Sequence, residues 1–446
     1  MPKRDAGNRT AVTVDVKPAI TPATAEPAAK PEPPAKPERA QGVESKEPTK
    51  PADAVVTSAS LASRALPQEA AATTATAPFD VTPTATAPEV SSPPQLTALV
   101  AQPRVPLLNL LGTLVINALS FVVQLFDPPP VVPPGSSVTI GRAQLAVPCD
   151  CRAVDARWYF PNQDEEPTGV TYLQHGFFRS NANVSALAVQ LAEETNTIVV
   201  APTITSNFFA VGGFWINGDP MHRAIAALFT DPDRTALQAS ATAAAIDAGM
   251  LSPGQTLTLP DQFVLAGHSA GGNLVAAVAG YIAESGSDDL RAVIMFDGVD
   301  NGGAIGAGVR KLPEAVPVYQ IASPCGLCNG FGSGTTALEA ARPGQFVGVL
   351  LEHGTHIDAE GASSGFPAKL VCGFPRSRNV DAVQILAGGW IVDALHPQDP
   401  PIGVYGTPGS TISVPTPAGT ATAQVLGQAP AEARPSSAPV QTTVAA

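Results

Sequence analysis

Large aromatic side chains are scarce in this 446-residue chain, which is only 5% aromatic. Phe79 is the single aromatic residue among residues 1–104, a stretch rich in Pro, Ala and Thr. A segment without large apolar groups cannot offset the conformational entropy that it loses on ordering. We therefore expect residues 1–104 to be a disordered spacer. The Pro-, Thr- and Ala-rich tail at residues 398–446 leads to the same expectation.

Basic side chains are also few. The 25 Lys and Arg residues stand against 38 Asp and Glu residues, which gives a net charge of −13. Binding to a phosphate backbone needs a surplus of Lys and Arg, so the composition excludes nucleic acid as a partner. No apolar run of signal-peptide length follows residues 1–10, and we expect no secretory signal there. The long spacer nevertheless favours the cell envelope or secretion over the cytoplasm.

Cysteine is rare as well. Cys325 and Cys328 have the spacing of a redox or metal motif, but no second pair and no cluster of His supports a zinc site. We therefore predict neither a metal nor an organic cofactor. A structural disulfide in this loop is the better interpretation if the compartment is oxidising. The chain has five cysteines, and an odd number leaves at least one free thiol. They are Cys149, Cys151, Cys325, Cys328 and Cys372.

An uncharged segment, Val105–Phe126, is long enough to cross a bilayer. Its polar residues are spaced by three or four positions, which places them on one stripe of a helix. Such a stripe favours a helix that lies on the domain or at a membrane surface over one that spans the membrane. We therefore assign residues 105–134 to an apolar helix and a Pro-rich linker, with contact to a membrane surface as a predicted role.

Residues 135–397 alternate apolar strands with helical stretches, and this pattern predicts an α/β fold with a mostly parallel sheet covered by helices on both faces. About 260 residues is a normal size for one such domain. The expected strands are 138–147, 152–160, 169–174, 197–202, 262–266, 292–296, 316–322 and 346–351, and the expected helices are 183–194, 220–229, 235–248, 271–282 and 380–394.

The strongest chemical signal is Gly267-His268-Ser269-Ala270-Gly271, which lies between the strand at 262–266 and the helix at 271–282. A G-x-S-x-G pattern in this context makes a sharp turn from strand to helix, because the small flanking residues allow the backbone to turn tightly. The turn presents the Ser269 hydroxyl at the carboxyl end of the sheet. Ser269 is therefore the candidate nucleophile.

A nucleophilic serine needs a base and an orienting acid. Among the six His residues, His353 and His356 lie just past the strand at 346–351, and His356 is favoured because Gly354 lets the chain turn back over the site. The loop after the strand at 316–322 contains no Asp or Glu as far as residue 329. The candidate acids therefore come one strand earlier, where Asp297 is favoured over Asp300, a residue that is also suited to cap a helix.

A tetrahedral intermediate needs two N–H donors for its oxyanion. We expect these to be the amides of Ala270, which follows the nucleophile, and of Phe177, in the His-Gly-Phe loop after the strand at 169–174. An apolar loop further along the chain is suited either to line an acyl pocket or to pack in the core. The candidate substrate-binding residues are Phe178, Phe208, Phe209, Phe214 and Trp215.

The order of these motifs resembles the α/β-hydrolase superfamily over roughly Val138–Leu395. The GHSAG elbow and the late GTHID resemble esterases, lipases and chlorophyllase-like enzymes, and the Pro/Ala-rich leader is similar to that of actinobacterial, especially mycobacterial, lipase-like proteins. The resemblance implies hydrolysis of carboxylic esters, acyl or lipid-like, by a Ser-His-Asp triad without a cofactor. The alternative hypothesis is a non-catalytic cell-envelope interaction protein that keeps the fold.

Overall fold

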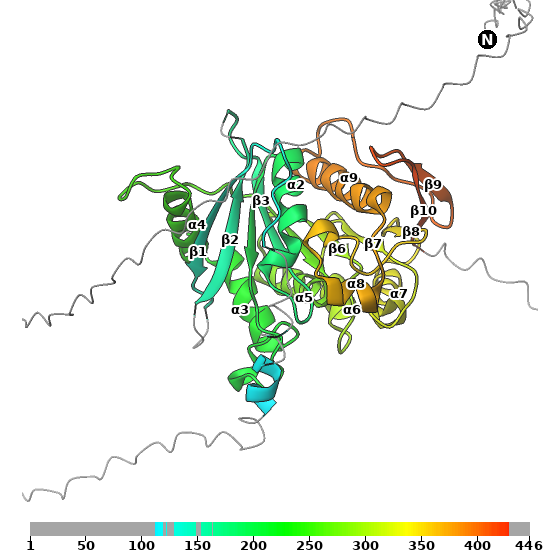
Figure 1. Cartoon of the computed structure of the whole chain (residues 1–446), viewed down its shortest axis with the longest axis horizontal. Helices are drawn as coiled ribbons and strands as arrows, with labels where there is room; N and C mark the ends of the chain where they lie inside the picture. Colours follow the sequence, from blue (N-terminus) through cyan, green and yellow to red (C-terminus); the bar gives the residue numbers. More distant parts are fainter. Residues whose placement is uncertain (1–111, 119–121, 123–128, 149–152, 163, 428–446) are drawn as a thin grey trace, which may run out of the picture. The chain divides into compact units, whose positions relative to one another are not determined.

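The computed structural model describes residues 112–118, 122, 129–148, 153–162 and 164–427 (Figure 1). The predicted spacer at residues 1–104 lies outside the described residues, as do Cys149, Cys151 and part of the segment Val105–Phe126.

A sheet of ten strands forms the centre of the described part (Figure 1), with the order β1-β2-β4-β3-β5-β6-β7-β8-β10-β9. The six strands from β3 to β8 run parallel, and β2 joins them antiparallel to β4. The strands are β1 (Thr139–Leu145), β2 (Val154–Phe160), β3 (Gly169–Gln174), β4 (Thr197–Pro202), β5 (Phe263–His268), β6 (Leu290–Phe296), β7 (Val318–Ala322), β8 (Gly348–Leu351), β9 (Thr411–Val414) and β10 (Ala421–Val425).

Helices cover both faces of the sheet. One buried core contains side chains of α3, α4, α5 and α6, and a second core on the other face contains those of α2 and α9. Adjacent residues of a strand enter different cores, as Tyr172 and Leu173 do, because successive side chains of a strand point to opposite faces. The helices are α2 (Ser185–Thr195), α3 (Asp219–Thr230), α4 (Thr235–Asp247), α5 (Ala270–Ser285), α6 (Ala304–Val309), α7 (Ser333–Ala341), α8 (Phe366–Cys372) and α9 (Ser377–Leu395).

Every residue of β3, β4 and β5 is buried. Burial on both faces is the reason that these strands are nearly continuous apolar runs in the sequence. The predicted fold class is confirmed: a mostly parallel sheet with helices on both faces, in the strand order of an α/β-hydrolase. The structure adds three short helices, α6, α7 and α8, which the periodicity did not indicate.

The prediction of a disordered tail from residue 398 is wrong for residues 398–427. β9 and β10 form a hairpin, and β10 pairs antiparallel with β8, with Ala423 opposite Leu351. This pairing covers the backbone donors and acceptors at the edge of β8, the strand that leads to His356. The α/β domain therefore extends beyond the predicted boundary at residue 397, and residues 428–446 lie outside the described residues.

Residues 112–118, within the predicted apolar segment, form a short helix beside the loop that contains Phe209. The Thr113 hydroxyl donates a hydrogen bond to the Phe209 carbonyl at 3.4 Å, while Leu114 and Val115 are 67% and 63% exposed. Within the described residues, no helix combines the length and the apolar character that crossing a membrane requires.

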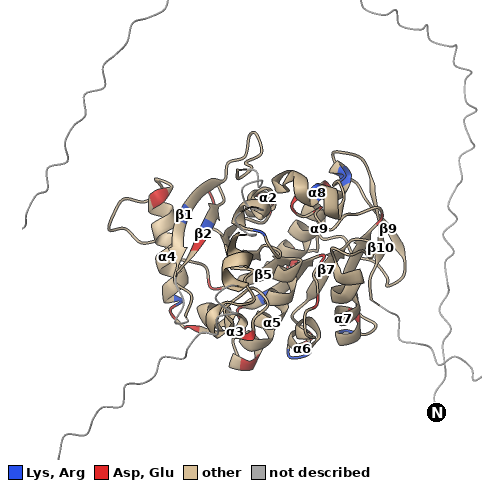
Figure 2. Ribbon diagram, turned by 60° about the horizontal axis from the view of Figure 1, so that its bottom comes forward, with Lys and Arg blue, Asp and Glu red and all other residues tan. Residues whose placement is uncertain are grey.

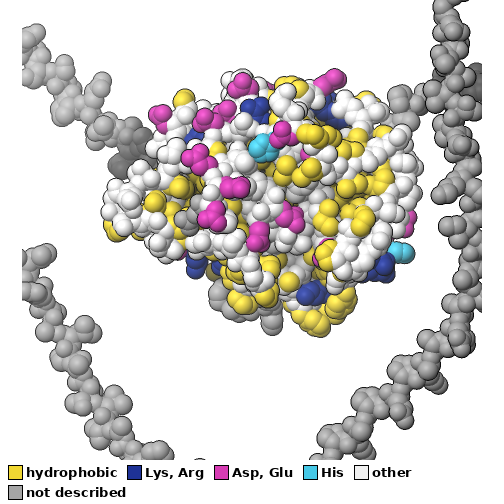
Figure 3. All heavy atoms as spheres, turned by 90° about the horizontal axis from the view of Figure 1, so that it is seen from above, with side chains coloured by type: hydrophobic (Ala, Val, Ile, Leu, Met, Phe, Trp, Pro, Cys, Tyr) yellow, Lys and Arg dark blue, Asp and Glu magenta, His cyan; other side chains and the backbone are white. Residues whose placement is uncertain are grey.

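Charged side chains are thinly spread over the domain (Figure 2). On the face drawn in Figure 3, acidic side chains are more prominent than basic ones. This agrees with the sequence, in which Asp and Glu exceed Lys and Arg.

Candidate active site

Ser269 sits at the sharp turn between β5 and α5, with backbone angles φ 57° and ψ −119°. The turn brings α5 against the loop after β3, since a Cβ added at Gly271 would lie 2.4 Å from the Gln174 carbonyl oxygen. Only glycine permits such a close approach of two backbones. The local sequence therefore places the Ser269 side chain, which is largely buried, at the carboxyl end of a central strand.

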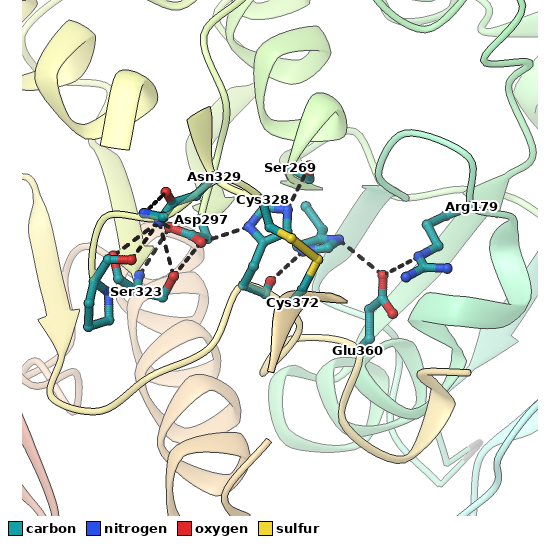
Figure 4. The surroundings of a disulfide bond; sticks show 12 residues. Arg179, Ser269, Asp297, Ser323, Cys328, Asn329, Glu360 and Cys372 are labelled. Carbon is teal, nitrogen blue, oxygen red and sulfur yellow. Dashed lines mark hydrogen bonds and ion pairs between the residues drawn. A yellow bond between two sulfur atoms is a disulfide. The ribbon is translucent and has the colours of Figure 1, made fainter. Parts of the chain in front are cut away.

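His356 lies in the loop after β8, and its ring lies between Ser269 and Asp297. Its Nε2 is 2.9 Å from the Ser269 Oγ, and its Nδ1 is 2.7 Å from an oxygen of Asp297 (Figure 4). An ionised carboxylate only accepts, so Nδ1 carries the proton and Nε2 is free to accept from the hydroxyl. Asp358 folds the loop, because its carboxylate accepts from both the amide and the hydroxyl of Thr355.

Asp297 directly follows β6, and its carboxylate is buried and held by the loop after β7. The Ser323 amide and hydroxyl donate to its two oxygens at 3.0 Å and 2.6 Å, and the Asn329 side-chain amide approaches at 3.4 Å (Figure 4). The loop after β7, in which the sequence offered no Asp or Glu, thus donates hydrogen bonds to Asp297 at the end of the neighbouring strand β6. Sequence reasoning missed Ser323 and Asn329, because a serine and an asparagine in a loop are common turn residues.

The same loop is joined to α8 by a disulfide between Cys328 and Cys372 (Figure 4). The expectation of a structural disulfide at this loop is met, but the bond connects Cys328 to a distant helix and leaves Cys325 as a free, exposed thiol. The link ties the segment that holds Asp297 to the segment that follows His356.

The two predicted oxyanion donors lie close to the serine. Gly176 passes directly over it, since a Cβ added there would be 3.0 Å from the Ser269 Cβ. Phe177 follows Gly176, and Ala270 follows Ser269. No hydrogen bond between described residues takes the amide of Phe177 or of Ala270. Both amides are therefore without a hydrogen-bond acceptor among the described residues, and their role as oxyanion donors stays a prediction.

Aromatic rings gather beside this loop. The Phe177 ring contacts those of Phe178 and Trp215, with centroids 4.3 Å and 6.3 Å apart, and Trp215 also lies 6.2 Å from Phe208. The Phe209 ring lies tilted against that of Phe208, with centroids 4.4 Å apart. Phe214, which was predicted with them, packs against the buried core, and so do Phe177 and Trp215. Core packing, one of the two interpretations left open by the sequence, is therefore present, and the acyl pocket stays a prediction.

A cavity of about 150 Å³ lies on the other side of the site and is lined by His356, Leu327 and Val371. A larger cavity, about 520 Å³, lies at the opposite edge of the sheet, near the start of β6, and none of Ser269, His356 and Asp297 lines it. Cavity volume alone would therefore have indicated the edge of the sheet opposite Ser269.

The alternatives for the base and the acid lie elsewhere. His353 is exposed and adopts a positive φ of 57° in the loop. Asp300 accepts from the amides of Gly303 and Ile305 at 3.0 Å and 2.8 Å, so it caps the start of α6. Neither of them enters the chain of hydrogen bonds at Ser269.

Two further buried histidines hold backbone groups of the site, and sequence reasoning assigned them no role. His175 accepts from the Ile204 amide at Nε2, and its Nδ1 lies 2.7 Å from the Gly176 carbonyl. The Nε2 of His268 is 2.7 Å from the His356 carbonyl. Burial lowers the pKa of each of these histidines to about 4.

These two pKa values predict a loss of stability in acid. In the unfolded chain a histidine binds a proton near pH 6.5, so between pH 6.5 and 4 the unfolded state holds more protons than the native state. The free energy of unfolding should therefore fall as the pH drops through this range, by about 3 kcal/mol for each histidine. Urea unfolding at pH 7 and pH 4.5 measures the change.

Variants isolate the histidine contribution from that of the carboxylates. His268→Gln should show a smaller loss of stability between the two pH values than the parent protein. His353→Asn, which changes an exposed histidine and suits a positive φ, should show the same loss as the parent. An equal loss in all three proteins would contradict the assignment.

No family model matches the sequence, and no curated protein matches it. Among solved structures, a thermostable esterase from Pseudomonas putida is 14% identical, with 62% of this chain and 88% of that chain covered and a TM-score of 0.38. A Pyrobaculum calidifontis esterase is 12% identical over 55% of this chain and 88% of its own, with a TM-score of 0.32. Likeness at this level adds nothing to the fold that the sheet order already shows.

Proposed function

We propose that the protein is a serine hydrolase that cleaves carboxylic esters. The observation that carries the proposal is the continuous chain of hydrogen bonds from Ser269 through His356 to Asp297, at 2.9 Å and 2.7 Å, on a sharp turn at the carboxyl edge of the sheet. A hydroxyl, an imidazole and a buried carboxylate in this order are the parts of a nucleophile, its base and the group that orients the base.

In the proposed mechanism, the Ser269 Oγ attacks the ester carbonyl carbon while His356 Nε2 takes its proton. Asp297 holds the imidazole in the required tautomer and stabilises the imidazolium that forms. The amides of Phe177 and Ala270 donate to the oxyanion of the tetrahedral intermediate. His356 returns the proton to the leaving alcohol, and water, activated by the same imidazole, then releases the acyl group from Ser269.

We further propose that the substrate is an apolar, lipid-like ester. Aromatic rings stand beside the oxyanion loop, and on the opposite side Leu327 and Val371 line the cavity next to His356. Large apolar side chains are exposed on that side, a surface typical of contact with apolar partners. They are Leu327, Phe331, Phe366, Leu370, Val371 and Phe374.

The exposed Leu114 and Val115 of the helix at residues 112–118 support the predicted contact with a membrane surface. The disulfide between Cys328 and Cys372 supports a location in the cell envelope or outside the cell, because such bonds persist in oxidising compartments.

An active-site-directed fluorophosphonate tests the nucleophile before a substrate is known. We expect the full-length protein to incorporate one label, and peptide mapping to locate it at Ser269, because the imidazole activates this hydroxyl. The exposed Ser252 serves as the internal control and should stay unlabelled. A folded protein that takes up no label would favour the alternative, a non-catalytic interaction protein that keeps the fold.

A further inference from the structure

A largely buried ion pair connects two loops of the site. The Nε of Arg179 donates to the Oε1 of Glu360 at 2.9 Å, and the two side chains are only 13% and 0% exposed (Figure 4). Arg179 lies two residues after the predicted oxyanion donor Phe177. Glu360 lies four residues after His356, so the pair links the oxyanion loop to the loop of the base.

His268 lies between this ion pair and His356. Its Nδ1 is 3.5 Å from the same oxygen of Glu360, and its ring centroid is 4.8 Å from that of His356. Its Nε2 faces the His356 carbonyl at 2.7 Å. A carbonyl only accepts, so Nε2 carries the proton and donates. His268 therefore holds the backbone of the residue whose ring bonds to Ser269.

The free-energy cost of burying these charged groups indicates that they fix the geometry of the two loops more than they stabilise the fold. Two charges taken out of water rarely stabilise a fold more than apolar residues of the same size would. The Oε2 of Glu360 and the Nδ1 of His268 make no hydrogen bond to any described residue. Such unsatisfied polar atoms are an added cost in a protein interior.

We propose that Arg179, Glu360 and His268 are positioning residues, which fix the imidazole of His356 relative to the oxyanion loop. This inference rests on the proposed hydrolase function. The ion pair sets the spacing of the two loops, and His268, by donating to the His356 carbonyl at 2.7 Å, independently fixes the backbone of the loop that carries the base. Catalysis by oriented groups is sensitive to such spacing, since a misplacement of 1 Å costs about 100-fold in rate.

The test compares variants by kcat per active site, with the active sites counted by fluorophosphonate labelling. His268→Phe removes the donor and keeps a ring, and Arg179→Gln removes the charge of the ion pair. We expect each to lower kcat about 10- to 100-fold with little change in KM for a short-chain p-nitrophenyl ester. His268→Gln keeps a donor near the position of Nε2 and should recover most of the rate.

A matched control exists on the surface. The Nε of Arg223 also lies 2.9 Å from a carboxylate oxygen, that of Asp219, but both side chains are more than half exposed. Arg223→Gln should leave kcat and KM at the parent values. An effect on folding alone would lower the number of labelled sites and the melting temperature, and would leave kcat per labelled site unchanged.

The results separate the two proposals. An active parent whose kcat per site is unaltered in both His268→Phe and Arg179→Gln overturns the positioning role and leaves the hydrolase proposal intact. A parent that neither takes the label nor cleaves the ester overturns both. Nitrogen-15 NMR of labelled histidines gives a readout that needs no turnover. It should show His268 protonated at Nε2 in the parent, and protonation at Nδ1 would also contradict the proposal.

Discussion

Replacing Ser269 with alanine is expected to lower kcat for a short-chain p-nitrophenyl ester by about 10⁵- to 10⁶-fold. In the proposed mechanism this substitution removes the atom that forms the acyl-enzyme, and serine hydrolases with such a triad lose about this factor when the serine is removed. The urea midpoint should stay close to that of the parent, because Ser269 and alanine place the same backbone and Cβ in the turn. Ester hydrolysis and urea unfolding measure the two effects.

Ser252→Ala is the control for this experiment, since Ser252 is exposed. It should retain the full rate. Turnover in Ser269→Ala at a tenth of the parent rate or more would show that the nucleophile lies elsewhere. Turnover in neither the parent nor the variants, with folded proteins, would support the interaction-protein hypothesis.

Asp297→Asn is expected to lower kcat about 10⁴-fold. An asparagine keeps the size of the side chain, but its amide donates where the carboxylate accepted, so it favours the tautomer of His356 with the proton on Nε2. In that tautomer Nε2 cannot accept the proton of Ser269, which lies 2.9 Å away. The rate of ester hydrolysis at pH 7 to 9 measures the loss.

Asp300→Asn separates the two candidate acids. Asp300 caps α6 through the amides of Gly303 and Ile305, and asparagine caps helices about as well as aspartate. The two amides, however, bind different oxygens of Asp300, and asparagine offers only one acceptor. The variant should therefore keep its rate and lose about 1 kcal/mol of stability for the missing hydrogen bond. A large loss of rate in Asp300→Asn together with an unchanged rate in Asp297→Asn would reverse the assignment.

The strands of the central sheet and the helices that cover it could be predicted, because their burial produces local patterns of apolar residues. β3, β4 and β5 are buried on both faces and read as continuous apolar runs. The hairpin of β9 and β10 was not predictable in this way. Its strands have four and five residues, rich in Thr, Ser and Ala, and it forms against the edge of β8, which the local sequence does not contain.

The elbow at Ser269 was predictable from five residues, because its small flanking side chains are needed by the local turn. For the base and the acid the sequence offered two candidates each. His356 and His353 lie in one loop, as Asp297 and Asp300 do. Position in a loop reduced the candidates to these two pairs. The direction of each side chain then distinguished the members of a pair, and this direction depends on the packing of neighbouring loops.

The sequence by itself determined the layered α/β fold of the central domain and the turn that carries Ser269, because hydrophobic periodicity and small residues at a tight turn act over a few neighbouring positions. Only the tertiary structure decided which groups surround Ser269. Arg179 and Glu360 are 181 residues apart in the chain, and Cys328 and Cys372 are 44 apart. Such contacts form only when the strands bring their carboxyl ends to one edge of the sheet. A local sequence pattern therefore does not indicate the partner of a buried charge or of a cysteine.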